Sequence, residues 1–126
     1  YINEDNSLHI NYLAEPDPRG SMGLGGITTG GSLNFGNFID AIDYKTGKVV
    51  WRHKMTGSNV GLLTTAGGVL FMNNGGGIEA LESTTGKPLW HSQVGNLTAP
   101  PETFMMDGKQ HVVAYISGGL FMFVLN

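Results

Sequence analysis

The sequence of 126 residues contains no cysteine. A disulfide bond, a thiolate nucleophile and a cysteine-based zinc site are therefore excluded. Seven basic and ten acidic residues give a formal net charge of −3, so the chain also lacks the basic excess of a nucleic-acid-binding surface. No apolar run approaches the roughly 18 residues of a membrane-spanning helix, and no signal peptide is recognisable. The chain opens on Tyr1 rather than on Met, and we expect it to be a piece of a longer protein.

Charged residues are scarce, at 13%, whereas glycine is abundant, with 20 copies. Glycine costs about 1 kcal/mol inside a helix, so this composition excludes a coiled coil or a helical bundle. Glycine does not recur at every third position, which excludes collagen, and the content of branched and aromatic apolar residues excludes a disordered chain. Many glycines in tight turns between apolar runs are typical of a soluble β-structure.

An internal repeat dominates the sequence. Residues 36–51 align with residues 75–90 without a gap, at an offset of 39 residues. Seven of the 16 aligned positions are identical, a similarity that chance rarely produces. The identical pairs are Gly36/Gly75, Ile39/Ile78, Ala41/Ala80, Thr46/Thr85, Gly47/Gly86, Lys48/Lys87 and Trp51/Trp90. Repeats of this length are units of solenoids, propellers or arrays, so this pattern predicts the architecture.

Each copy of the repeat predicts a β-hairpin. In the first copy, residues 38–42 and 48–53 are short runs of strand-forming residues, and residues 43–47 form the turn between them. The aspartate that opens the turn can accept hydrogen bonds from turn N–H groups, and Gly47 can adopt the positive φ that closes the hairpin. The second copy repeats this layout, with Gly86 in the place of Gly47.

The other recurring residues suit packing between the copies. Ala41 and Ala80 leave room beside a strand, while Trp51 and Trp90 supply a large apolar surface at a fixed place in each unit. A single hairpin cannot bury its own face, so neighbouring copies must stack. Because the tryptophans recur at the same place in the repeat, we interpret them as packing residues rather than as groups that stack on a cofactor.

Further strands follow the same spacing. Residues 62–65 and 69–73 flank a tight Ala-Gly-Gly turn, residues 103–106 and 110–116 flank Asp-Gly-Lys, and residues 120–125 follow. Asp-Gly between apolar runs is a strong hairpin signal. Four-stranded units of roughly 40 residues are the blades of a β-propeller.

We therefore predict an all-β fold, a partial β-propeller of about two and a half four-stranded antiparallel blades. Its parts are a half blade over residues 38–54, a full blade over residues 60–93 and an incomplete blade over residues 98–126. Propellers close with typically four to eight blades, so the chain supplies part of a ring. Residues 1–37 are predicted to be an irregular segment rich in glycine and proline, with one strand near residues 8–13.

Some residue groups lack the pattern that a functional site requires. The glycine-rich stretch 23–31 is not followed by the helix that a phosphate-binding loop needs, so we interpret it as a surface or axial loop. The four histidines show no paired metal-ligand spacing, whereas a zinc site needs three or four converging ligands. Asp43 fits the turn and Asp40 aligns with Glu79, so neither aspartate is assigned acid–base catalysis.

Four segments resemble one protein family. Residues 41–51 and 80–90 resemble the tryptophan docking motif of quinoprotein propellers, the PQQ (pyrroloquinoline quinone)-dependent alcohol and sugar dehydrogenases. Residues 61–71 resemble the strand pair that precedes the penultimate docking motif of this family. Residues 100–114 resemble its C-terminal stretch, with His111 where the family usually has tyrosine. The segments also occur in the order and at the spacing of the family.

The resemblance implies the C-terminal blades of an eight-bladed propeller that holds PQQ and a calcium ion on its axis. In this family an aspartate acts as base, and a hydride passes from an alcohol carbon to the quinone in the bacterial periplasm. The calcium ligands, the catalytic aspartate and, where present, an adjacent-cysteine disulfide belong to earlier blades. No catalytic or metal-binding residue is therefore carried over to this chain.

By position, the resemblance places the starts of the inner strands at the rim of the cofactor. Asn59 and Leu120 stand where many relatives have tryptophan. The residues expected on the axis are Asn59, Val60, Gly61, Ser117, Gly118, Gly119 and Leu120. The residues expected to dock the blades are Ala41, Gly47, Trp51, Ala80, Gly86 and Trp90.

We expect a C-terminal fragment of a dehydrogenase that oxidises an alcohol or a sugar, in which this part closes the propeller and supports the cofactor site. Its partners would be the remaining blades and a small alcohol or sugar, without nucleic acid, and its open edge strands favour self-association. The isolated chain is predicted to be inactive. Two alternatives stay open: a non-catalytic propeller scaffold or binding module, such as an outer-membrane assembly factor or a sensor ectodomain, and a chain that completes a ring by association.

Overall fold

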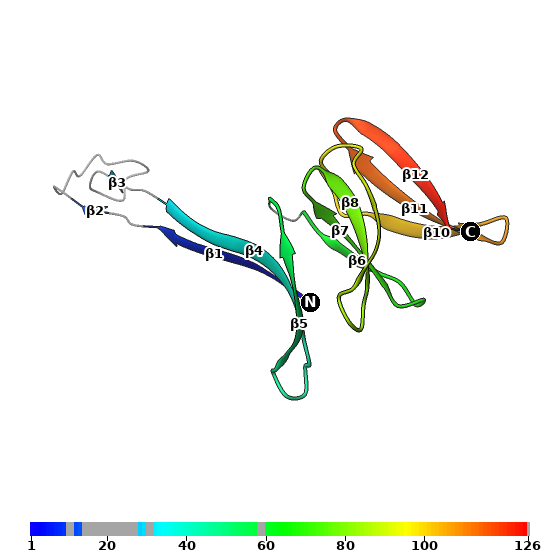
Figure 1. Cartoon of the computed structure of the whole chain (residues 1–126). Coiled ribbons are helices and arrows are strands. Elements are labelled where there is room, and N and C mark those ends of the chain that lie inside the picture. Colours follow the sequence, from blue (N-terminus) through cyan, green and yellow to red (C-terminus); the bar gives the residue numbers. More distant parts are fainter. Residues whose placement is uncertain (10–11, 14–27, 30–31, 58–59, 126) are drawn as a thin grey trace. The chain divides into compact units, whose positions relative to one another are not determined.

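The structure, a computed structural model, describes residues 1–9, 12–13, 28–29, 32–57 and 60–125. The regular elements in these ranges are strands. Among the described residues there is no helix long and apolar enough to cross a membrane. The strands are β1 (Ile2–His9), β2 (Tyr12–Leu13), β3 (Thr28–Thr29), β4 (Ser32–Ile42), β5 (Val49–Met55), β6 (Leu62–Thr64), β7 (Val69–Asn74), β8 (Gly77–Glu82), β9 (Pro88–Ser92), β10 (Glu102–Met106), β11 (Lys109–Ile116) and β12 (Gly119–Leu125) (Figure 1).

The chain divides into two compact units. The smaller unit, residues 5–36, includes the short antiparallel pair β2–β3, in which Tyr12 lies opposite Thr29. The larger unit comprises residues 1–4 and 37–126. The glycine-rich stretch 23–31 falls in the smaller unit and, apart from β3, lies outside the described residues.

Three sheets follow one another along the chain, in the orders β1-β4-β5, β6-β7-β8-β9 and β10-β11-β12. Neighbouring strands from β4 to β5, from β6 to β9 and from β10 to β12 are antiparallel. These sheets confirm the all-β fold and the predicted hairpins. The sequence predicted two strands for the first blade, but the structure has three, because β1 pairs with a β4 that begins at Ser32.

The turn of the repeat forms as its residue types predict. The Asp43 carboxylate accepts hydrogen bonds from the Lys45 N–H at 2.9 Å and from the Thr46 hydroxyl at 3.0 Å. The Gly47 N–H then donates to the Asp43 carbonyl at 2.7 Å, with a φ of +70° at the glycine. The second copy repeats this contact, since the Gly86 N–H donates to the Glu82 carbonyl at 2.8 Å.

Both copies of the repeat also contain the same β-bulge. Trp51 lies opposite Ala41, whereas the next paired residue along β4 lies opposite Val49, so the outer strand contains one extra residue, Val50. β8 and β9 show the same shift immediately after the pair of Ala80 and Trp90. The small alanine opposite each tryptophan leaves room for the indole. The bulge turns the tryptophan side chain in a different direction from that of the exposed residue beside it.

Two hydrophobic clusters join consecutive sheets. In the first cluster, β4 and β5 pack against the four-stranded sheet through Ile39, Ala41, Trp51, Met55, Leu70, Met72 and Leu81. In the second cluster, the four-stranded sheet and the loop after it pack against β11 through Phe71, Ile78, Ala80, Leu97, Val112, Ala114 and Ile116. Alternate residues of β7 therefore face opposite neighbours, which is the arrangement of stacked propeller blades.

Trp51 contacts the neighbouring four-stranded sheet through both its indole N–H and its ring. Its side chain is 9% exposed, and its indole N–H donates to the Ser83 carbonyl at 3.1 Å. Its ring lies on Gly86, where an added Cβ would be 2.7 Å from Trp51 Cδ2 and Cε3. Trp90 is 40% exposed and meets the edge of the Phe123 ring, with ring centroids 5.1 Å apart.

The pair of repeat glycines allows a matched test of this contact. We predict that Gly86→Ala lowers the free energy of unfolding by about 1–3 kcal/mol more than Gly47→Ala. Both substitutions place alanine at a positive φ and carry a similar backbone cost, but only the Cβ at position 86 meets a tryptophan. Urea unfolding followed by tryptophan fluorescence measures the difference. Equal losses in the two variants would contradict the packing role of Gly86.

Candidate functional site

Four connections meet at one end of the sheets of the larger unit, and we call this the loop end. They are residues 56–57 with 60–61, residues 75–76, residues 93–101 and residues 117–118. The Gly75 N–H donates to the Thr56 carbonyl at 2.9 Å, and the Ser117 N–H donates to the Asn96 carbonyl at 3.1 Å. Each hairpin turn is therefore tied to the loop that enters its own blade.

The loop over residues 93–101 connects two blades at this end. The Gly95 N–H donates to the Gly76 carbonyl at 2.9 Å, and the Thr98 N–H donates to the Tyr115 carbonyl at 3.0 Å. Between them, the Leu97 N–H donates to the buried Asn73 side-chain oxygen at 3.3 Å. Backbone groups that a loop would otherwise leave unpaired are satisfied here, so the loop is held in a defined position.

Two of the residues that the sequence placed on the axis, Gly61 and Ser117, contact the loop 93–101. Gly61 packs on the loop 93–101, since an added Cβ would lie 2.7 Å from Pro100 Cβ. Ser117 and Gly118 form the β11–β12 turn with φ values of 46° and 86°, and Ser117 is tied to the same loop through Asn96. Asn59 lies outside the described residues.

The remaining predicted residues differ in their surroundings. Val60 is 41% exposed and lines a cavity at the loop end. Gly119 begins β12, and the Leu120 side chain is 73% exposed. Leu120 lies opposite Tyr115, which alternates with two buried residues of β11, so Leu120 faces away from the second hydrophobic cluster.

The loop-end cavity has a volume of about 330 Å³ and a polar lining. It is lined by Thr56, Gly57, Val60, Asn73, Asn96 and Leu97. Beside it, the Asn37 amide donates to the Gly57 carbonyl at 2.9 Å, while Asn37 Oδ1 is buried without a hydrogen-bond partner in the described part of the chain. A buried acceptor of this kind is costly unless a partner satisfies it.

The sequence reasoning did not single out these asparagines. Asn37 lies in β4 opposite Met55. Asn73 precedes the last residue of β7, and Asn96 lies in the loop 93–101. Their common signal is the recurrence of asparagine beside the glycine-rich ends of strands. Amide side chains there can donate to carbonyl or carboxylate oxygens and accept from N–H groups of a ligand.

The carboxylates of the repeat have structural partners. Arg52 donates from Nε and Nη2 to the two oxygens of Asp40, both at 2.8 Å, and its Nη2 also contacts Glu4 at 2.6 Å. The hydrogen bonds from Arg52 hold the pKa of the buried Asp40 carboxyl below its ordinary value. The Lys45 N–H and the Thr46 hydroxyl lower the pKa of Asp43 in the same direction. Both groups are held ionised by protein donors.

The histidines that the structure describes have separate environments. His53 Nε2 lies 3.3 Å from Glu79 Oε2, whereas the His111 ring stacks on Phe104 with centroids 5.3 Å apart. Within the described ranges, no three His, Asp or Glu side chains converge as metal ligands.

The comparisons with known proteins agree with the stacked β-sheets of this structure. A family model described as outer membrane protein assembly factor BamB, built from PQQ-type repeats, matches residues 33–126. The chain belongs to the PQQ-repeat β-propeller family. Its sheets are propeller blades, and the match includes both copies of the 39-residue repeat.

Individual relatives of this PQQ-repeat chain are quinoprotein dehydrogenases. Quinoprotein alcohol dehydrogenase PedE of Pseudomonas putida is 38% identical over 84 residues, which cover 64% of this chain and 13% of that protein. Quinoprotein glucose dehydrogenase of Gluconobacter oxydans is 33% identical over 106 residues, with coverages of 64% and 13%. The PQQ-repeat chain thus spans about an eighth of the length of these relatives.

A solved structure supports the same relation. The quinohemoprotein alcohol dehydrogenase ADHIIG from Pseudomonas putida HK5 matches with a TM-score of 0.60 and 28% sequence identity. The match covers 68% of this PQQ-repeat chain and 13% of that chain.

The Asp40–Arg52 pair predicts a pH dependence of stability. Because the folded state lowers the pKa of Asp40, this residue stabilises the fold above its unfolded pKa, and that stabilisation is lost as the pH falls through the lowered folded pKa. We predict that Asp40→Asn destabilises the chain at pH 7 and that the penalty shrinks in acid, below the ordinary aspartate value of 3.8. Urea midpoints at pH 7 and pH 3 test this.

The control for this experiment is Asp107→Asn. Asp107 is an exposed turn residue with a φ of 51°, a conformation that asparagine also tolerates. Its urea midpoint should stay close to that of the parent chain at pH 7. If the Asp40→Asn penalty has the same size at both pH values, the ionised pair does not stabilise the fold.

The contact of Gly61 with Pro100 predicts a local effect at the loop end. In Gly61→Ala, the new methyl group must displace the proline, so amide chemical shifts throughout residues 93–101 should change and stability should fall by about 1–3 kcal/mol. Gly57→Ala is the comparison, because its Cβ would meet no atom within 4 Å. Shifts confined to the immediate neighbours of position 61 would show that the loop does not rest on this glycine.

Proposed function

We propose that this chain is the C-terminal part of a PQQ-dependent dehydrogenase that oxidises an alcohol or a sugar by hydride transfer to the quinone. The similarity to quinoprotein alcohol and glucose dehydrogenases, at 33–38% identity over 84 to 106 residues, carries this proposal. The loop-end geometry supports it, because the residues that connect the similar segments line a polar cavity.

The residues present fit a ligand such as PQQ. The unpartnered and buried Asn37 Oδ1 can accept an N–H, and the cavity beside it adds the amides of Asn73 and Asn96 and the apolar Val60. PQQ, when bound, supplies a quinone that accepts a hydride from the alcohol carbon. In this proposal Asn37 and Asn96 orient the edge of the ligand, and Val60 excludes water from that edge.

In this proposal the calcium ion is bound by other blades of the longer protein. Since no group of metal ligands converges in the described part of this chain, the calcium ligands and the catalytic base would be supplied by the rest of the longer protein. We place that protein in the bacterial periplasm, the compartment that the family resemblance implies.

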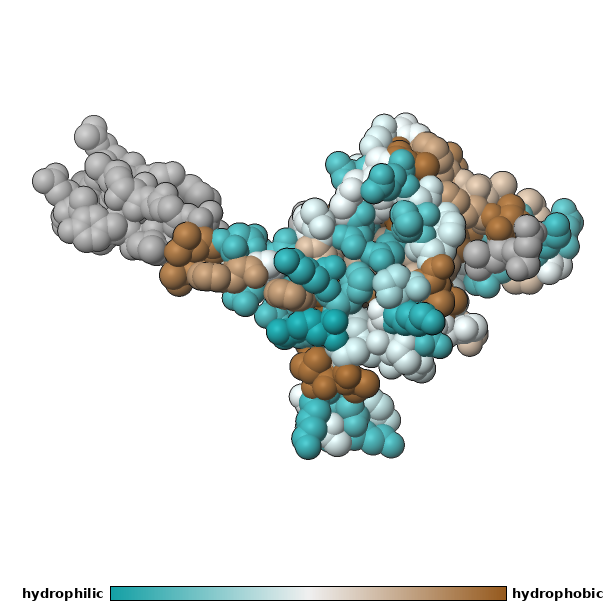
Figure 2. Space-filling model, viewed as in Figure 1, coloured by the Kyte–Doolittle hydropathy of each residue, from teal (hydrophilic) through white to brown (hydrophobic). Residues whose placement is uncertain are grey.

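The C-terminal sheet offers a face for a further blade. Figure 2 shows apolar surface along this sheet, where Leu120, Met122 and Val124 are 73%, 53% and 43% exposed. These residues alternate with those that face the second hydrophobic cluster, so they occupy the opposite face. In our proposal the remaining blades cover this face, and in the isolated chain it favours self-association.

A non-catalytic scaffold is the second candidate function. The description of the matching family model, an outer membrane protein assembly factor, favours it. In that case the loop end would bind a protein or peptide, and PQQ would not bind. Binding of PQQ therefore separates the two candidates.

A chimera tests the proposed function. Residues 37–119 replace the corresponding segment of the Pseudomonas putida alcohol dehydrogenase, and the purified chimera is assayed with PQQ, calcium, ethanol and a dye acceptor. We expect PQQ binding and measurable turnover, because the exchanged blades supply the same loop end. A chimera that shows cooperative unfolding but binds no PQQ would favour the scaffold function.

The isolated chain provides a second test. With PQQ, calcium, an alcohol and a dye acceptor, we expect no turnover above a control without protein, because the catalytic base and the calcium ligands belong to other blades in this proposal. Turnover by the 126-residue chain would overturn this division of roles.

A further inference from the structure

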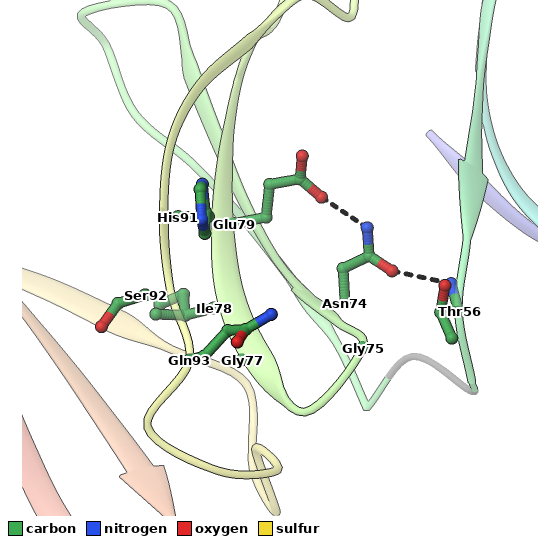
Figure 3. A pocket seen from close by; sticks show the side chains of 9 residues that line it. All are labelled: Thr56, Asn74, Gly75, Gly77, Ile78, Glu79, His91, Ser92 and Gln93. Carbon is green, nitrogen blue, oxygen red and sulfur yellow. Dashed lines mark hydrogen bonds between the residues drawn. The ribbon is translucent and has the colours of Figure 1, made fainter.

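A second cavity lies between the first two sheets. It has a volume of about 320 Å³ and is lined by Thr56, Asn74, Gly75, Gly77, Ile78, Glu79, His91, Ser92 and Gln93 (Figure 3). It shares only Thr56 with the loop-end cavity. Its one carboxylate, Glu79, comes from β8, and Figure 3 shows this side chain directed toward Asn74, which in turn contacts Thr56.

The Glu79 carboxylate has an amide and an imidazole as neighbours. Its Oε2 accepts a hydrogen bond from the Asn74 amide at 2.6 Å and lies 3.3 Å from His53 Nε2. Asn74 is itself fixed, because its Oδ1 accepts the Thr56 N–H at 2.7 Å. The Glu79 side chain is only 13% exposed, and the lining contains neither lysine nor arginine. A largely buried carboxylate is costly unless it is paired and hydrogen-bonded, so a further donor at Glu79 would be favourable.

The repeat shows what occupies this place in the preceding blade. Asp40 aligns with Glu79, and each lies opposite one residue of its outer strand: Arg52 in the first blade and His91 in the second. The Arg52 guanidinium binds both oxygens of Asp40 at 2.8 Å. The second blade keeps the carboxylate but has the shorter imidazole, and the cavity lies beside it.

We propose that this cavity binds a small cation with a guanidinium group, held against Glu79 as Arg52 is held against Asp40. A planar guanidinium makes paired, charge-assisted hydrogen bonds to a carboxylate, which a spherical ammonium cannot reproduce. The Gln93 side chain, which also lines the cavity, offers a further acceptor oxygen. This site is separate from the dehydrogenase proposal and does not depend on it.

Titration of the chain with methylguanidinium tests the proposal. Two-dimensional NMR at pH 8 and low salt follows amides of β8 and β9, because imidazole groups are ordinarily neutral at that pH and screening is weak. We expect saturable shifts for residues 74–79 and 91–93, and weaker binding of methylammonium. The absence of saturable shifts in the parent chain would overturn the proposal.

A pair of isosteric variants identifies the carboxylate. Glu79→Gln removes the charge with little change in shape, and we expect methylguanidinium affinity to fall by about tenfold or more. Glu102→Gln is the matched control, because Glu102 is an exposed residue of β10 outside the cavity lining, and its affinity should equal that of the parent. Unchanged affinity in Glu79→Gln would overturn the assignment.

A third variant keeps the charge of Glu79 and fills the proposed ligand site with an arginine side chain. His91→Arg gives the second blade the residue that the first blade has, so the protein supplies its own guanidinium. We expect methylguanidinium binding to be lost while the melting temperature is maintained or raised. Circular dichroism confirms that the sheets are intact. A folded His91→Arg chain that binds the probe as tightly as the parent would contradict the proposed position of the ligand.

Discussion

The contact between one sheet and the next is the constraint on which the rest of this structure depends. A twisted sheet of three or four strands has two faces, and in this chain alternate residues of β7 are buried on both. Trp51 spans one such junction, with its ring on Gly86 and its N–H on the Ser83 carbonyl. The glycine serves the turn and the contact together, because its positive φ closes the hairpin and its missing side chain admits the indole. At the next junction the equivalent tryptophan, Trp90, is 40% exposed and meets the edge of the Phe123 ring.

Repetition of the packing brings the connecting loops to one end, where the blades are free to differ. The backbone contact of each turn with the loop that enters its blade is repeated, as Gly75 with Thr56 and Ser117 with Asn96 show. The side chains around these contacts are not repeated. The buried Asn37 oxygen and the His91 imidazole, which lies opposite Glu79 where the first blade has an arginine, are features of single blades. The repeated strands and turns thus form a regular framework, and the side chains that differ between blades form the candidate binding sites.

Local rules predicted the hairpins well, because their determinants are close together in the sequence. The Asp43 turn, the glycine at position 47 and the Asp-Gly turn before β11 each specify their own geometry. The third strand of the first sheet was not predictable in this way. β1 pairs with β4 across a long intervening segment. No short turn motif joins the two strands, so the sequence does not indicate that they pair. The β-bulge after Ala41 was equally hidden, since the extra residue, Val50, has the same strand propensity as its neighbours.

The sequence alone determined the repeat, the hairpin turns, the strand periodicity and the resemblance to quinoprotein propellers, because each depends on residue types at short and regular spacing. Only the tertiary structure decided which polar groups share a cavity. Asn37, Asn73 and Asn96 are far apart in the chain, and stacking of the sheets brings them to the loop end. The contrast between Asp40 with its arginine and Glu79 beside a cavity was likewise visible only in three dimensions. A carboxylate in a sequence does not show which cation, if any, the fold places against it.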